Sequence, residues 1–136
     1  MDTEVLREAF DLAARAASVA EARHRTIAWL LRCPVGEQAA EAAALIVSEL
    51  VTNAIVHSGS EVIRCALRLG RGLLRIEVTD QGVSGAEPAA RIPADDDVSG
   101  RGLLLVSAVS EAWGVSAALA GGRTVWATVR TGECAR

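Results

Sequence analysis

The chain has 136 residues, of which 51% are hydrophobic, and it carries a formal net charge of −3 at pH 7. This length fits one domain with a sizeable core, and the acidic balance argues against direct nucleic-acid binding through a basic face. All 14 basic residues are arginines, so a lysine nucleophile and the lysine of a phosphate-binding P-loop are both excluded.

The cysteines and the N-terminus bear on the cellular compartment. Cys33, Cys65 and Cys134 are far apart and follow neither a zinc-binding nor a disulfide pattern. The first residues include Asp2 and Glu4 and no apolar stretch, so they do not resemble a signal peptide. No run approaches the ~18 apolar residues of a membrane span. We therefore expect a cytoplasmic protein that does not enter a membrane.

The first half of the chain predicts helices. Residues 1–15 fit either a short strand or a helix. Ser18 can cap a helix that ends at Arg32. A longer helix is predicted over residues 37–57, because apolar side chains recur there at helical spacing, at Ala43, Val47, Leu50 and Ala54.

The second half predicts two hairpins separated by a loop and a helix. The predicted order is strands over 62–69 and 73–79, a loop over 81–99, a helix over 103–112, and strands over 113–119 and 124–130. No linker divides the chain, so we expect a single domain over 1–136. Its fold class is an α+β two-layer sandwich in which helices cover one face of a mostly antiparallel sheet.

The long helix carries a polar pair that could perform chemistry. Glu49 and Asn53 are four residues apart, so they point to the same side of the helix one turn apart, and His57 follows four residues later. An amide oxygen can bind Mg²⁺, and a carboxylate can orient or deprotonate a nucleophile. The alternative is a solvated helix edge with no role.

A second motif follows the strand over 73–79. A carboxylate at a strand end, here Asp80, can accept a hydrogen bond from an exocyclic amine such as that of adenine. Gly82 would let a flat base approach the backbone closely. The alternative is an ordinary turn of the Asp-x-Gly type.

A third motif lies before the predicted third helix. Gly100 and Gly102 would expose backbone N–H groups there, and a helix N-terminus favours negative charge. Arg101, between the two glycines, could reach a phosphate. The alternative is a flexible loop that ends in a capped helix.

Together and in this order, these motifs resemble the GHKL ATPase superfamily, which has the Bergerat ATP-binding fold. Residues 49–54 resemble its N box, and 80–82 resemble its first glycine box. The second glycine box corresponds to 99–103 and the closing strand motif to 122–126. The resemblance covers residues 7–130, which is almost the whole chain.

The resemblance implies a role for each matching residue. Asn53 would bind Mg²⁺ between the phosphates of ATP, and Glu49 would act as the general base or orient the attacking hydroxyl. Asp80 would bind the adenine amine, with Thr124 joined to the base through a water.

The glycine boxes would supply the rest of the nucleotide site. Gly82 would line the base pocket, and residues 83–99 would form the ATP lid. Ser84 stands where the first glycine box normally has its second glycine, which indicates a different lid position and weaker binding. The phosphates would be held by the second box, which comprises Ser99, Gly100, Arg101, Gly102 and Leu103.

The size of the chain leaves room only for the ATPase domain, which is typical of the stand-alone anti-sigma factor serine/threonine kinases. Such a kinase would act in transcription regulation: it would phosphorylate an anti-anti-sigma partner with a STAS domain and sequester a sigma factor. A second interpretation is a nucleotide-binding interaction module without kinase activity, and a third is a domain whose helix and glycines are purely structural. The resemblance is compatible with a homodimer formed through the N-terminal strand and helix.

Overall fold

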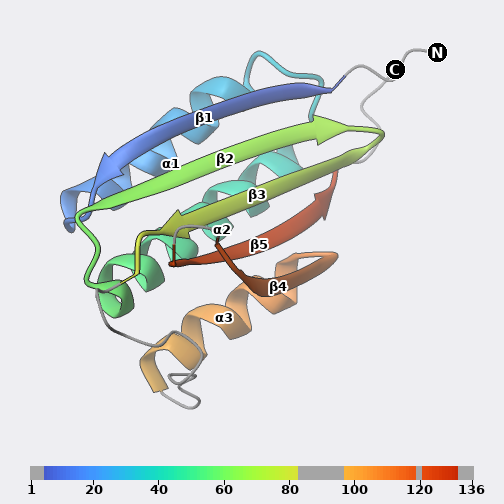
Figure 1. Cartoon of the computed structure of the whole chain (residues 1–136). Helices are drawn as coiled ribbons and strands as arrows, with labels where there is room; N and C mark the ends of the chain where they lie inside the picture. The colour runs from blue at the N-terminus through green and yellow to red at the C-terminus, as the bar shows by residue number, and fades with distance from the viewer. Residues whose placement is uncertain (1–4, 83–96, 119–120, 132–136) are drawn as a thin grey trace.

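The computed structural model describes residues 5–82, 97–118 and 121–131, and they form one antiparallel sheet with three helices (Figure 1). In chain order the elements are β1 (Leu6–Ala13), α1 (Ala17–Leu30), α2 (Glu37–Ser58), β2 (Val62–Gly70), β3 (Leu73–Asp80), α3 (Asp97–Val109), β4 (Ala112–Ala117) and β5 (Arg123–Arg130).

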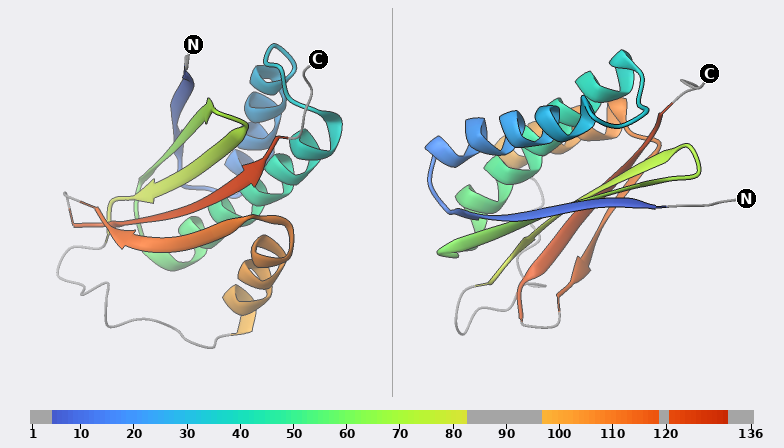
Figure 2. Two further views of the ribbon diagram at one scale, coloured as in Figure 1. Left: turned by 90° about the vertical axis from the view of Figure 1, so that its right-hand side faces the viewer. Right: turned by 90° about the horizontal axis from the view of Figure 1, so that it is seen from above.

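The sheet has the strand order β1-β2-β3-β5-β4, and every neighbouring pair is antiparallel. All three helices lie on the same side of it (Figure 2). In β3, buried residues alternate with half-buried ones, because one face of the strand meets the helices and the other does not. The predicted fold class is therefore confirmed.

The core lies between the sheet and α2. Ile46, Val47, Leu50 and Val51 are all fully buried. By length and hydropathy, residues 37–57 could also cross a membrane, contrary to the sequence-based expectation that no run is apolar enough. Because its apolar side chains pack in the core, we interpret α2 as the central helix of the sandwich.

Three local predictions change in the structure. Residues 6–13 form a strand, which settles the ambiguous N-terminus. Ser18 does not cap α1: the cap position is Ala16 without a side-chain hydrogen bond, and Ser18 lies buried within the first turn. The third helix begins at Asp97, six residues before the predicted Leu103, so it includes Gly100 and Gly102 in spite of their modest cost to helix stability.

The cysteines that the structure describes behave as packing residues. Cys65 faces the core, and burial raises the pKa of its thiol to about 12. Burial also raises the pKa of Cys33, against a smaller opposing effect from Arg32. Neither thiol is therefore a reactive thiolate near neutral pH. Cys134 lies outside the described residues.

The end of β3 contacts the turn between β4 and β5 so closely that only glycine fits. Gly82 has φ +77°, and a Cβ there would lie 2.6 Å from the carbonyl oxygen of Gly121. Gly72, in the turn between β2 and β3, has a similar φ of +73° but open space around it. The two glycines therefore share a backbone conformation and differ in crowding.

This pair yields a matched test. We expect Gly72→Ala to cost about 1 kcal/mol of unfolding free energy through backbone strain alone. Gly82→Ala should cost a further ~1–3 kcal/mol, because its methyl group collides with backbone that cannot move aside cheaply. Urea denaturation of both variants measures the difference. Equal losses would contradict the crowding at the end of β3.

Candidate functional site

The polar pair predicted on α2 lies at the edge of the core. Glu49 and Asn53 are both half-buried, while Leu50, Val51 and Ala54 beside them are buried. Within the described part of the chain, neither polar side chain makes a hydrogen bond or an ion pair. Half-buried polar groups without protein partners are available to a ligand. His57 is exposed in the last turn of the helix.

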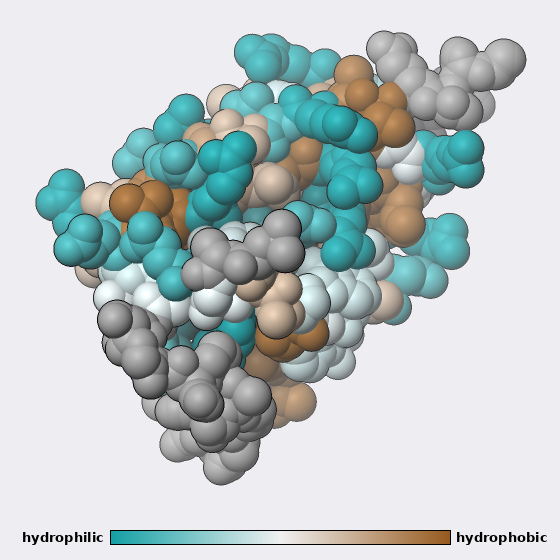
Figure 3. All heavy atoms as spheres, viewed as in Figure 1, coloured by the Kyte–Doolittle hydropathy of each residue, from teal (hydrophilic) through white to brown (hydrophobic). Residues whose placement is uncertain are grey.

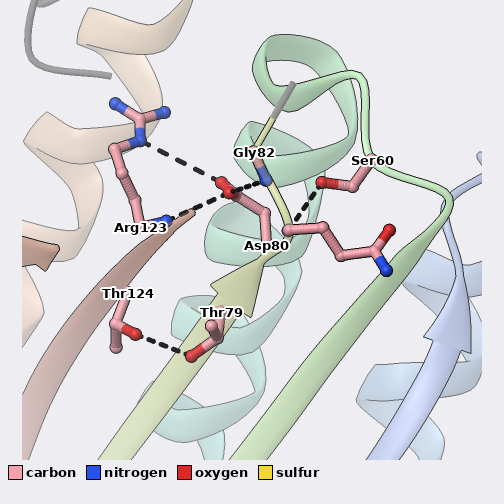
Figure 4. A network of polar contacts seen from close by, with 7 residues as sticks. Ser60, Thr79, Asp80, Gly82, Arg123 and Thr124 are labelled. Atoms are coloured by element: carbon pink, nitrogen blue, oxygen red, sulfur yellow. Dashed lines mark hydrogen bonds and ion pairs between the residues drawn. The ribbon is translucent and has the colours of Figure 1, made fainter. Parts of the chain in front are cut away.

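Asp80 is the most buried charged side chain of the candidate site. It ends β3 on the helix-facing side of the sheet, and only 5% of its side chain is exposed. Its Oδ1 accepts backbone hydrogen bonds from Gly82 at 2.9 Å and from Arg123 at 3.1 Å (Figure 4). These two donors fix the carboxylate and leave Oδ2 without a hydrogen bond among the described residues.

Gly122 shows how closely the start of β5 packs against the end of β3. A Cβ at Gly122 would lie 1.9 Å from the backbone carbonyl oxygen of Asp80. The glycines at 82, 121 and 122 therefore bring the start of β5 against the end of β3. The sequence assigned Gly82 to the approach of a base, whereas the structure shows a structural need for glycine there. Its contact with a base stays a prediction.

Arg123 is a site residue to which the sequence analysis assigned no role. Its Nε lies 4.0 Å from Oδ2 of Asp80, and 21% of its side chain is exposed. Figure 4 shows the guanidinium beside the carboxylate, on the same face of the sheet. The sequence pattern of β5 could have predicted this position of Arg123. Side chains alternate along a strand, so Arg123, two positions before buried Val125, points toward the helices as Val125 does.

The same alternation corrects the prediction for Thr124. Its hydroxyl lies 2.7 Å from that of Thr79, its partner in the β3–β5 register. Both threonines point to the face of the sheet opposite Asp80, because side chains alternate along a strand (Figure 4). Thr124 therefore does not lie beside Asp80 to share a base with it, and Arg123 takes that place.

The second glycine box also differs from its predicted setting. Residues 99–102 lie inside α3 and not in a loop before it. The N–H groups of the first three helical residues, 97–99, have no intrahelical acceptor, whereas those of Gly100 and Gly102 fall beyond them. The side chains of Ser99 and Arg101 lie outside the described set, as do lid residues 83–96, including Ser84. Leu103 is half-buried and packs against the core.

The donor set bears on whether a metal ion would fit. No three His, Cys, Asp or Glu side chains gather as a metal site among residues 5–82, 97–118 and 121–131. Mg²⁺ needs no such cage, because it keeps several waters and binds substrate phosphates together with one or two protein oxygens. Asn53 is half-buried and has no partner among the described residues, so it suits that mode of binding.

The contact between Asp80 and Arg123 can be measured. We expect Arg123→Met to lower the free energy of unfolding by ~1–3 kcal/mol, because a buried carboxylate loses its cation. In the double variant with Asp80→Asn, the loss should be smaller than the sum of the single losses. Chemical denaturation of the four proteins checks this, and strictly additive losses would contradict the coupling.

Comparison with known proteins identifies the family of this chain. A sequence profile of the histidine kinase-like ATPase domain family matches residues 12–129. Among solved structures, the fold is similar to the RsbU and RsbW domains of Rv1364c from Mycobacterium tuberculosis, with a TM-score of 0.69 and 20% identity. That match covers 92% of this chain but 32% of the other. No curated protein matches this chain in sequence. The chain belongs to the histidine kinase-like ATPase domain family.

Proposed function

We propose that this chain binds Mg²⁺-ATP and acts as an anti-sigma factor serine/threonine kinase. The observation that carries the proposal is the pair Glu49 and Asn53, half-buried on one side of α2 and without protein partners in the described region. A helix edge with no role has no reason to place an unpaired carboxylate and an unpaired amide one turn apart beside the core. The family match supports nucleotide binding.

The proposed roles follow from the position of each side chain. Oδ2 of Asp80 would accept a hydrogen bond from the adenine amine, since Oδ1 is already held by two backbone donors. The amide oxygen of Asn53 would hold Mg²⁺, which supplies positive charge to the phosphates. The free N–H groups at the start of α3, those of residues 97–99, would favour the phosphates at the same site.

Glu49 would act on the acceptor. A general base must lie within hydrogen-bond reach of the proton that it removes, and Glu49 lies one turn before Asn53 on the same side of α2. It would take the proton from a serine or threonine hydroxyl of the partner as that oxygen attacks the terminal phosphate. Positioning and charge neutralisation would supply most of the remaining rate enhancement.

The partners belong to the same proposal. We take the phosphate acceptor to be a STAS-type anti-anti-sigma protein, and the sequestered protein to be a sigma factor, in the cytoplasm. The likeness in fold to a chain that contains an RsbW domain supports this choice. The resemblance of residues 49–54 and 80–82 to the boxes of the stand-alone kinases supports it as well.

A second candidate is a nucleotide-binding interaction module without transfer activity. Two observations favour it: Ser84 replaces a glycine of the first box, and Gly102 lies inside α3, beyond the N–H groups available for phosphate. Both candidates predict nucleotide binding, so only transfer to an acceptor separates them.

Calorimetry of ATP binding tests the nucleotide site. We expect Asn53→Ala to weaken binding at least about tenfold when Mg²⁺ is present, and much less when it is absent, because the variant loses a metal ligand. Gln38→Ala is the matched control, since it removes an exposed amide near the start of the same helix. Unchanged Mg²⁺-ATP affinity in Asn53→Ala would refute the proposed metal role.

Phosphotransfer tests the proposed base. With a STAS-domain acceptor and labelled ATP, Glu49→Gln should slow transfer by about 10²–10⁴-fold while leaving the affinity for ATP nearly unchanged. Glu41→Gln, two turns earlier and exposed, should transfer at the wild-type rate. If the wild type binds both ATP and acceptor yet transfers nothing, the chain is an interaction module and the kinase proposal fails.

A further inference from the structure

The face of the sheet that no described helix covers carries a row of arginines. The strand registers place Arg7 opposite Arg68, and Arg68 opposite Arg75, across β1, β2 and β3. Figure 3 looks onto this face and shows hydrophilic side chains over these strands. Like charges directly opposite one another destabilise a sheet, so the row disfavours the isolated fold.

Two of the three arginines have no counter-charge among the residues that the structure describes. Arg75 pairs with Glu77, with 2.6 Å between Nε and Oε2, and its guanidinium lies 4.5 Å from the ring centroid of Trp126. Arg7 and Arg68 are exposed and make no ion pair with any described residue. The only other arginine on the middle of this face, Arg64, is neutralised by Asp11 at 2.9 Å.

A strip of small and apolar side chains, interrupted by Glu77 between Ala66 and Trp126, runs beside the arginine row. Ala9 lies opposite Ala66, and Trp126 lies opposite Glu77 and Gly114. A Cβ at Gly114 would come within 2.8 Å of the indole of Trp126, so the glycine makes room for that ring on the sheet. The arginine row, together with Ala9 and Ala66 of the strip, borders a hollow of about 390 Å³ over β1, β2 and β3, whose lining also includes Glu8 and Glu77.

The charge of this face limits what can cover it. The two pairs Arg64–Asp11 and Arg75–Glu77 cancel, which leaves the +2 of Arg7 and Arg68, in a chain whose net charge is −3. A second copy packed on this face would bring its own uncompensated +2 against the first. Nucleic acid and anionic membranes would bring negative charge against the net negative charge of the whole chain, whereas a short acidic segment needs to contact only this face. A protein segment with carboxylates fits the face best.

The distance between the arginines of the row favours a helical partner segment. Adjacent strands are about 4.8 Å apart, so the three arginines span roughly 10 Å. Two turns of α-helix span about 10.8 Å, which matches carboxylates at positions i, i+4 and i+7. Apolar side chains on the next stripe of such a helix would reach Ala66 and Trp126. Arginine and tryptophan are the residues that most often dominate binding energy at interfaces.

We propose that this face binds an acidic amphipathic helix of a partner protein, laid across β1, β2 and β3 along the arginine row. The proposal does not rest on the nucleotide site, because Asp80 points to the opposite face and lies five residues along β3 from Arg75. The chain would thus hold a partner and a nucleotide on two separate surfaces.

The test uses a designed peptide. The probe is a helical peptide with glutamates at i, i+4 and i+7 and leucines on the adjacent stripe. The control peptide keeps the leucines and carries glutamines in place of the glutamates. Titration of the full chain, followed by ¹⁵N-resolved NMR and calorimetry, should show binding of the glutamate peptide that weakens from about 0.05 to 0.3 M salt. Shifts should map to β1, β2 and β3.

Matched variants locate the binding. Arg7→Gln with Arg68→Gln should weaken the glutamate peptide at least about tenfold. Arg15→Gln with Arg32→Gln removes the same charge from exposed positions outside this face and should leave the affinity unchanged. Because all four side chains are exposed, neither variant should lower the melting temperature, and Arg7→Gln with Arg68→Gln should raise it slightly by removing two opposed like charges; calorimetry checks both.

Several outcomes would overturn the proposal. The first is that the wild type does not bind the glutamate peptide up to about 1 mM. The second is that both double variants lose the same affinity for it. The third is that the glutamine peptide binds as tightly as the glutamate peptide. A wild-type dimer that Arg7→Gln with Arg68→Gln alters would assign the face to self-association instead. Binding of phosphatidylserine vesicles that the same double variant abolishes would assign it to lipid.

Discussion

The burial of one face of α2 is the interaction on which the rest of the structure depends. The helix lies over the middle of the sheet, and Ile46, Val47, Leu50 and Val51 are removed from water there. Each such side chain contributes about 1.5–3 kcal/mol. Because Glu49 and Asn53 are on the same helix, the packing that holds the fold together also fixes where the polar pair lies. The proposed binding chemistry and the core packing therefore cannot vary independently in α2.

A second constraint acts at the end of β3. Asp80 is buried because β5 begins directly against it, and that approach is possible only because glycine occupies positions 82 and 122. The cost of burying a carboxylate is offset by two backbone N–H donors and by the guanidinium of Arg123. A nucleotide base that binds here, as we propose, would meet a carboxylate whose orientation is already set.

The two faces of the sheet differ in chemistry because strands alternate. On the helix-facing side the strands contribute apolar side chains and, at one end, Asp80 and Arg123. On the other side they contribute arginines, small residues and Trp126, an arrangement that suits contact with a partner and not a core. A domain of this size can in this way keep a ligand site and a docking surface apart without any additional element.

The sequence by itself determined the fold class and the candidate motifs. The apolar stripe of 37–57 and the alternation of 62–80 are periodic, and periodicity reports directly which side of an element is buried. The order of the motifs containing Glu49, Asp80 and Gly100 led to the family, which the profile match confirms. The start of α3 and the cap of α1 could not be placed, since local propensities at helix ends are weak and packing overrides them. Only the tertiary structure decided that Arg123 and not Thr124 lies beside Asp80, and that three arginines form one row. Both depend on strand register, which pairs residues far apart in sequence and is fixed by the packing of the whole sheet.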